Sequence, residues 1–231
     1  MKLRTALVML VLAAAAPARA TLYTYDFTGI NTTIPDNDSA GFSDTRTLSG
    51  MTGTPTTTIN DVNVTLNISG GYNGDLYGYL VHDSGFAILL NRTGKTSTDQ
   101  FGYADGGFNI TLDDQATTDI HLYGGNGGSA LTGTWKPDGR DVDPSLVLDT
   151  SPRTALLSSF NGLDPNGAWT LFLADAAGGD ESVLVSWSLG ISVVPEPTEW
   201  AMIIFAALAV FYKFVLPRLR QLRLKPVPVR A

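Results

Sequence analysis

The 231-residue chain has no cysteine and only two histidines, His82 and His121. Without cysteine there is no disulfide, no thiol nucleophile and no cysteine-bound metal, so we expect the core to stabilise the fold. A Ser-His-Asp triad would need one of these histidines beside a serine, but the serines lie in turn-like and strand-like segments, and no Gly-x-Ser-x-Gly elbow is present. We therefore expect no catalytic residues and no enzymatic activity.

Positive charge is scarce in the middle of the chain. Residues 21–198 contain six basic and twenty-one acidic residues, a balance of −15. An electrostatic field of this sign repels nucleic acid and attracts cations. The sequence therefore predicts no nucleic-acid partner.

Long apolar runs and helical periodicity are also missing between residues 21 and 193. Instead, apolar and polar residues alternate, which is typical of half-buried strands, in the segments 62–68, 169–173 and 183–191. Residues 75–83 and 86–91 are two further strand candidates, and turn-forming Gly, Asn, Asp and Ser recur roughly every ten residues. This pattern predicts an all-β fold, a jelly-roll-like antiparallel β-sandwich.

The N-terminus has the three parts of a signal peptide. Lys2 and Arg4 form a basic start, residues 6–16 are apolar, and Ala18 and Ala20 occupy the small-residue positions of a cleavage site. We expect a signal peptidase to remove residues 1–20 and the chain to be exported. The predicted organisation is a signal peptide (1–20), a β-sandwich (21–193) and a C-terminal sorting region (194–231).

Three segments of the sandwich, taken in order, resemble a known module. They are "INDVNVTLNISGGYNGDLYGYLVHDSGFAILLNRTG" (59–94), "ITLDDQA" (110–116) and "LSSFNGLDPNGAWTLFLADAAGGDESVLVSWSLGI" (157–191). Together they resemble the P domain, also called the Homo B domain, of kexin- and furin-like proprotein convertases. The resemblance implies a jelly-roll β-sandwich that has no active site of its own and stabilises a serine endopeptidase.

Clustered aspartates at the predicted strand ends are candidates for a structural calcium site. Calcium takes six to eight oxygen ligands, and the loops at one end of a sandwich can converge to supply them. The resemblance to the P domain places similar acidic residues at these motifs. The candidate ligands are Asp75, Asp113, Asp114, Asp175 and Asp180. Ordinary turn capping by these side chains is the alternative interpretation.

The C-terminal region combines a Pro-Glu-Pro motif (Pro195, Glu196, Pro197), an apolar stretch (200–216) and a basic cluster (Arg218, Arg220, Arg223). This order resembles the PEP-CTERM sorting signal, which implies recognition by an exosortase. We expect residues 200–216 to form a transmembrane helix that anchors the chain in the inner membrane with the domain outside. Processing would release the domain to the outer envelope or the extracellular matrix.

Three functions fit the sequence. The first is a non-catalytic envelope or matrix protein that serves in adhesion, with matrix polysaccharide as a partner. The second is an accessory domain for a separate subtilisin- or kexin-like serine endopeptidase. The third is a carbohydrate-binding module, suggested by the fold class and by the aromatic residues Tyr72, Tyr77 and Tyr123, although a fold alone does not establish a function.

Overall fold

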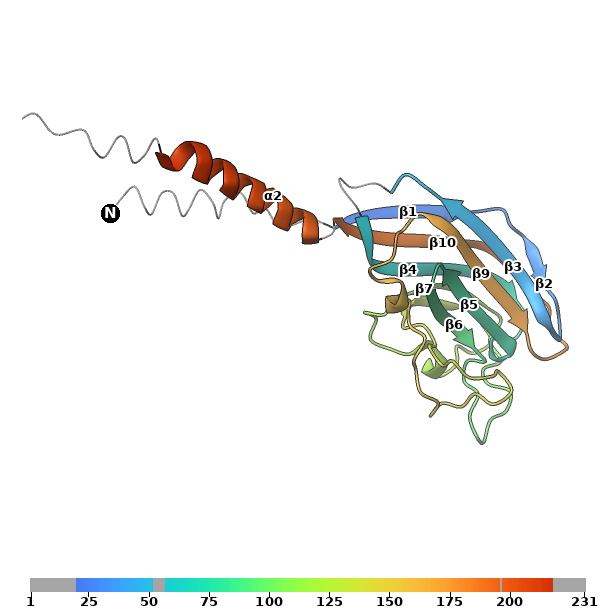
Figure 1. Cartoon of the computed structure of the whole chain (residues 1–231). Coiled ribbons are helices and arrows are strands. Elements are labelled where there is room, and N and C mark those ends of the chain that lie inside the picture. Colours follow the sequence, from blue (N-terminus) through green and yellow to red (C-terminus); the bar gives the residue numbers. More distant parts are fainter. Residues whose placement is uncertain (1–19, 52–56, 196, 218–231) are drawn as a thin grey trace, which may run out of the picture.

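The protein is a β-sandwich followed by a helix (Figure 1). The structure is a computed structural model, and it describes residues 20–51, 57–195 and 197–217. The strands are β1 (Thr21–Phe27), β2 (Thr32–Ile34), β3 (Asp38–Leu48), β4 (Thr57–Gly70), β5 (Leu76–His82), β6 (Gly85–Asn91), β7 (Gly107–Leu112), β8 (Leu131–Trp135), β9 (Gly167–Asp175) and β10 (Ser182–Pro195). Three 3-10 helices lie between strands: η1 (Asn73–Asp75), η2 (Ile120–Leu122) and η3 (Leu157–Phe160). The mostly β fold expected from the sequence is confirmed.

The strands form two sheets. One has the order β1-β10-β4-β7-β8, with β2 also paired to β10, and the other has the order β3-β9-β5-β6. The expectation of purely antiparallel pairing is wrong at one point, because β7 and β8 are parallel. Residues 113–130 connect these two strands through η2, and a connection of that length allows the chain to cross over and return in the same direction.

The core lies between the sheets and is formed by the inward-facing residues of the alternating segments. In β4 the side chains of Val62, Val64, Leu66 and Ile68 are all buried, as their spacing of two predicts. Two buried tryptophans fill the space between the sheets and have their ring N–H groups satisfied. Trp187 donates to Oδ2 of Asp44 at 2.7 Å.

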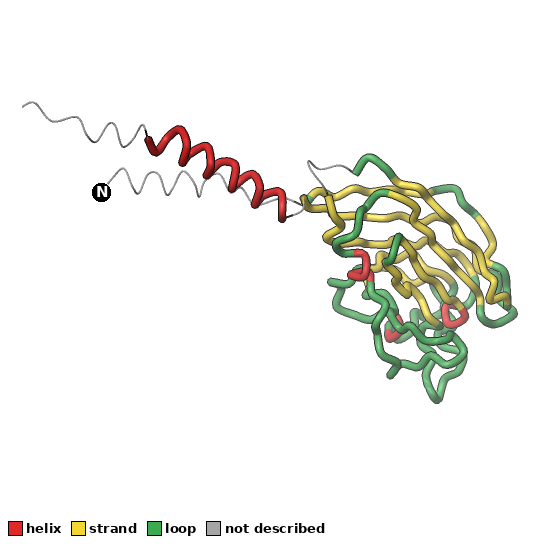
Figure 2. The backbone as a smooth tube through the Cα atoms, in the orientation of Figure 1, coloured by secondary structure: helices red, strands yellow, loops and turns green. Residues whose placement is uncertain are grey.

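A long segment without regular structure, residues 136–156, lies against the edge of the four-stranded sheet. Its amides at Asp138 and Gly139 donate to the carbonyl oxygens of Leu89 and Ile88 at 3.0 and 2.9 Å, and the amide of Ile88 donates to Ala155 at 3.0 Å. Figure 2 shows the longest loops gathered at this end of the sandwich. Strand β6 is therefore not an open edge that could pair with another chain.

The C-terminal helix differs from the expected membrane span. Helix α2 (Pro197–Val210) extends away from the sandwich, and the hydrogen-bond pattern becomes π-helical over η4 (Phe211–Val215). In the described part of the chain, no helix reaches the length and apolar character needed to cross a membrane. The expected transmembrane helix over residues 200–216 is therefore not found among the described residues.

Several expected processing residues lie outside the described residues: Ala18, Glu196, Arg218, Arg220 and Arg223. Ala20 is exposed and β1 begins at the next residue, so cleavage after Ala20 would leave β1 whole. Pro195 ends β10 and Pro197 begins α2, so the Pro-Glu-Pro motif stands between the sandwich and the helix.

Candidate functional site

His121 is a buried residue of η2 whose ring is bonded on both sides. Its Nδ1 lies 2.7 Å from Oδ2 of Asp138, and its Nε2 lies 2.9 Å from the carbonyl oxygen of Lys95. A carboxylate beside an imidazole is the arrangement that orients a general base in a triad. Here the second nitrogen faces a backbone oxygen in place of a serine, and no part of the ring is exposed. His121 is therefore a structural residue.

His82, at the end of β5, is held in the same way. Its Nδ1 lies 2.9 Å from the carbonyl oxygen of Ala168 and its Nε2 lies 2.6 Å from that of Asp164. The ring also stacks on Trp169 at a centroid distance of 4.0 Å. Since both nitrogens face acceptors within the fold, His82 has no ring nitrogen directed at a substrate. Neither histidine is placed to act as a general base.

Three of the five aspartates predicted to bind calcium lie at one end of the sandwich. Asp75 of η1 and Asp175 of β9 are joined through the backbone, because the amide of Ala176 donates to the carbonyl oxygen of Asp75 at 2.8 Å. Burial raises the pKa of Asp75, Arg92 lowers it, and the nearby charges of Asp180 and Asp36 raise it further. The sequence analysis did not name Asp36.

The other two predicted ligands lie elsewhere and cap turns. Asp113 accepts a hydrogen bond from the amide of Gln115 at 2.7 Å. Asp114 accepts from the amides of Leu157 and Ser158, at 3.3 and 2.7 Å, at the start of η3. Such bonds satisfy amides that the short helix leaves unpaired. The structure therefore does not bring the five aspartates together.

The acidic end of the sandwich is a poor match for calcium. Nη2 of Arg92 lies 3.1 Å from Oδ1 of Asp75, and a cation in that position repels a metal ion. No group of three or more His, Asp or Glu side chains within the described ranges is arranged to hold a metal. Calcium binding at Asp75, Asp175 and Asp180 stays a prediction that these contacts do not favour.

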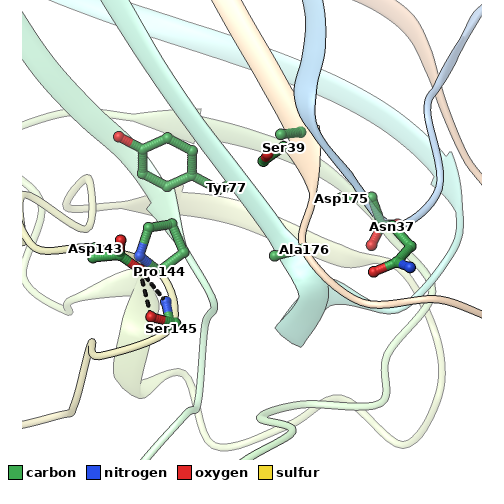
Figure 3. Close-up of a pocket in the computed structure, with 9 residues that line it drawn as sticks. Asn37, Ser39, Tyr77, Asp143, Pro144, Ser145, Asp175 and Ala176 are labelled. Atoms are coloured by element: carbon green, nitrogen blue, oxygen red, sulfur yellow. Dashed lines mark hydrogen bonds between the residues drawn. The ribbon is translucent and has the colours of Figure 1, made fainter.

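Beside these carboxylates is a surface pocket of about 440 Å³, shown in Figure 3. It is lined by Asn37, Ser39, Tyr77, Asp143, Pro144, Ser145, Ala174, Asp175 and Ala176. Asp175 is fully buried. Its Oδ1 accepts from the amide of Ala177 at 3.2 Å, whereas its Oδ2 has no hydrogen-bond partner among the described residues. Burial raises the pKa of Asp175 to about 6.

The buried side chain of Lys95 holds the opposite wall of the pocket, residues 143–145, in place. Nζ of Lys95 donates to the carbonyl oxygens of Ser145 and Val147, each at 3.0 Å. Within the wall, Oδ1 of Asp143 accepts from the amide and the hydroxyl of Ser145, at 2.8 and 2.6 Å (Figure 3). The hydroxyl and amide bonds lower the pKa of Asp143, so this carboxylate carries its charge at neutral pH.

The segment that forms this wall is anchored by a buried charge network, made of Asp119, His121, Asp138 and Arg140. The Arg140 guanidinium lies 3.3 Å from Oδ1 of Asp138 and 2.9 Å from Oδ2 of Asp119. Burial alone would lower the pKa of Arg140, but the bonds and charges of the two aspartates raise it. The network therefore holds a permanent positive charge between carboxylates, with His121 on the far side of Asp138.

An aromatic strip crosses the outer face of the four-stranded sheet, next to the pocket. It consists of Tyr77, Tyr79, Phe86 and Phe172, all half-buried. Tyr79 stacks on Phe172 at a centroid distance of 4.6 Å and lies 5.4 Å from Phe86. Since Tyr77 belongs to both the strip and the pocket lining, the two features form one continuous surface.

Of the three tyrosines considered for carbohydrate binding, Tyr72 and Tyr123 lie away from this surface. The hydroxyl of Tyr123 donates to Asp105 at 2.8 Å and accepts from the side-chain amide of Asn73 at 3.2 Å, both within the fold. The hydroxyl of Tyr72 donates to the carbonyl oxygen of Gly102 at 3.2 Å. Only Tyr77 lines the pocket.

Sequence reasoning named Asp175 and Tyr77 but not the pocket that they share. Besides the chain neighbours of Asp175, its other residues come from the β2–β3 turn, from the start of β3 and from residues 143–145, which are far apart in the sequence. No spacing pattern connects these segments. Asp-Pro-Ser at 143–145 is typical of a solvated turn, and only the contacts of Lys95 reveal that it is held against the sheet.

The sequence matches no protein-family model and none of the curated proteins. Two solved structures are similar: the Aeromonas sobria serine protease in complex with the chaperone ORF2 (18% identity, TM-score 0.42, 81% of this chain covered) and the serine protease of Aeromonas sobria (18%, 0.41, 80%). The match covers 29% of the other chain in each case, so this chain spans less than a third of their length. A likeness at this level assigns neither a family nor an activity.

Replacing Asp138 tests the buried charge network. Asp138→Asn leaves the Arg140 charge and the His121 ring without their shared carboxylate, and we expect a loss of about 3 kcal/mol in the free energy of unfolding. Urea denaturation followed by tryptophan fluorescence measures this loss. The matched control is Asp26→Asn, which removes an exposed carboxylate from β1. Equal free energies of unfolding for the two variants would contradict a stabilising role of Asp138.

The raised pKa of Asp175 predicts a pH-dependent stability. Because the pKa rises from 3.8 to about 6, the folded chain retains a proton that the unfolded chain has lost. The stabilising contribution is complete below about pH 4 and is lost as the pH rises past about 6. Relative to wild type, Asp175→Asn should therefore gain stability between pH 4 and pH 7 in urea titrations. A difference that does not change with pH would contradict the assignment.

Proposed function

We propose that this chain is an exported, non-catalytic binding domain that docks onto a second protein and acts as an accessory to a serine endopeptidase. The observation that carries the proposal is the continuous surface of the aromatic strip and the pocket. Aromatic side chains are enriched where proteins bind one another, because they bury a large apolar area at little conformational cost. Four of them are partly exposed on one sheet face beside an acidic pocket.

The absence of a free general base at either histidine favours recognition over catalysis. In this structure His82 and His121 have both ring nitrogens directed at acceptors of the fold. The pocket residues also lack a serine beside a histidine. What the surface offers a partner is shape, apolar area and negative charge.

The choice of a serine endopeptidase as the partner is supported by the sequence resemblance to the P domain. The resembling segments form β4, β5, β6, β9 and β10 and the end of β7. They include the central strands of both sheets, β10 and β4 in one and β9 and β5 in the other. These strands include the aromatic strip, since Tyr77, Tyr79 and Phe86 lie on β5 and β6 and Phe172 on β9. The resembling part of the chain is thus also the part with the candidate binding surface.

The adhesion or matrix role has less support, because it depends mainly on the C-terminal motif. Glu196 and the three arginines of that motif lie outside the described residues. Export itself is part of the proposal and is supported by the signal-peptide pattern of residues 1–20. Sorting by an exosortase remains a further element of the proposal, supported by the order of the Pro-Glu-Pro motif, the apolar helix and the arginines.

Site-specific photo-crosslinking in the native host tests this function. With p-benzoylphenylalanine at position 79 of the full chain, within the aromatic strip, we expect one dominant crosslink to a serine endopeptidase, identified by mass spectrometry. The matched control carries the same probe at position 22, where Leu22 is 64% exposed on β1 of the other sheet. Crosslinks at position 79 that contain no endopeptidase, or that equal those at position 22, would refute the proposal.

A further inference from the structure

The pocket beside β9 has negative charge and no positive charge in its lining. Its nine residues include Asp143 and Asp175 and no lysine, arginine or histidine. Asp143 is exposed at the rim, whereas Asp175 is fully buried. Two carboxylates in one pocket without a counter-ion are complementary to a ligand that carries positive charge.

The buried carboxylate has an unused acceptor. Oδ2 of Asp175 has no hydrogen-bond partner among the described residues and is shielded from solvent. Leaving a buried charged oxygen unpaired is costly, so such an atom in a pocket wall points to a missing donor. Asn37, which lies next to Asp175 in Figure 3, is an exposed residue of a turn, so its side chain is free to move aside for a ligand.

The charged groups around Asp175 do not neutralise it. Asp75 and Asp36 add negative charge, and Arg92 is the one cation that acts on its ionisation. Arg92 forms its hydrogen bonds with other groups, because it donates to Oδ1 of Asp75 at 3.1 Å and to the carbonyl oxygen of Gly74 at 2.9 Å. Asp175 therefore has no counter-ion of its own among the described residues.

The size and the walls of the pocket identify the kind of cation. A volume of about 440 Å³ is far larger than a single metal ion needs. Figure 3 shows the Tyr77 ring and Pro144 on one side of the pocket and Asp175 on the other. An aromatic face and a proline suit an apolar stem, and the carboxylate suits a charged head at its end.

We infer that the pocket binds the guanidinium or ammonium group of a basic side chain, arginine or lysine, presented by a polypeptide. The head group pairs with Asp175, the stem lies along Tyr77, and Asp143 on the opposite wall adds to the negative charge of the pocket. Residues that flank the basic side chain in the partner then pack on the aromatic strip, which begins at Tyr77. The choice of a polypeptide over a free cation rests on the proposed function, while the pairing of the head group does not.

Calorimetric titration of the full chain with small probes tests the head-group assignment without any partner. The probe is N-acetyl-arginine N-methylamide, and its neutral isostere N-acetyl-citrulline N-methylamide is the matched ligand control. We expect a Kd on the order of 1 mM for the arginine probe, as is reasonable for so small a ligand. The citrulline probe should bind at least tenfold more weakly.

Two pocket variants and one control variant locate the binding. Asp175→Asn and Asp143→Asn keep the shape of each side chain and its Oδ1 acceptor, so the bonds to Ala177 and Ser145 survive. Asp175→Asn should weaken the arginine probe at least tenfold and Asp143→Asn should weaken it less, whereas Asp26→Asn on the other sheet should change its Kd less than twofold. Lowering the pH from 7.5 to 5 should weaken binding to wild type but not to Asp175→Asn.

Four results would overturn the inference. The first two are no binding of the arginine probe at 10 mM, about ten times the expected Kd, and equal binding of the citrulline probe. The third is unchanged binding of the arginine probe to Asp175→Asn. The fourth is displacement of the arginine probe by 1 mM calcium chloride, which would show that the pocket is a metal-ion site. A free polyamine as the ligand is the remaining alternative. If spermidine bound at least tenfold more tightly than the arginine probe, the polypeptide assignment would be wrong.

The test separates this inference from the proposed function. Probe binding without an endopeptidase crosslink would retain the cation pocket and reject the protease partner. An endopeptidase crosslink without probe binding would retain the accessory function and reject the basic side chain as the recognised group.

Discussion

The buried ion pair between Asp138 and Arg140 is the interaction on which the candidate site depends. It lies in a segment of about twenty residues without regular structure, where the backbone alone offers little to hold the chain in one conformation. Asp138 accepts from Arg140 and pairs with His121, and Arg140 reaches Asp119. Because each charge is desolvated, the network is stable only when every member is present, which restricts this segment to one arrangement.

That restriction produces the pocket. With residues 138 and 139 bonded to β6, and Ser145 and Val147 held by Lys95, the Asp143–Ser145 turn stands at a defined place opposite Asp175. The sandwich supplies the other wall through β5 and β9, whose outward residues also form the aromatic strip. A rigid frame of this kind lowers the entropy that is lost when a partner binds, and it agrees with recognition as the role of the domain.

The sequence predicted the parts of the fold that follow from local periodicity and little of the site. Alternation in 62–68, 169–173 and 183–191 predicted the strands β4, β9 and β10, because a half-buried strand needs that pattern. Asp138 and Arg140 gave no signal, since polar residues are buried only when partners distant in the sequence satisfy them. Asp175 was named as a calcium ligand because it lies at a predicted strand end, and the position of Arg92 beside Asp75, which does not favour a metal ion there, could not be read from the sequence.

Residue-resolved amide hydrogen exchange on the full chain tests most directly whether the site is organised before a partner binds. The amides of Asp138, Gly139 and Thr154 donate to backbone oxygens of Leu89, Ile88 and Gly139. If the buried charge network holds this segment as described, these amides exchange about as slowly as those of β5 and β9, since they open only with the sheet. Rapid exchange at these three amides, with slow exchange in β5 and β9, would show that the pocket wall is not preformed and would contradict the account.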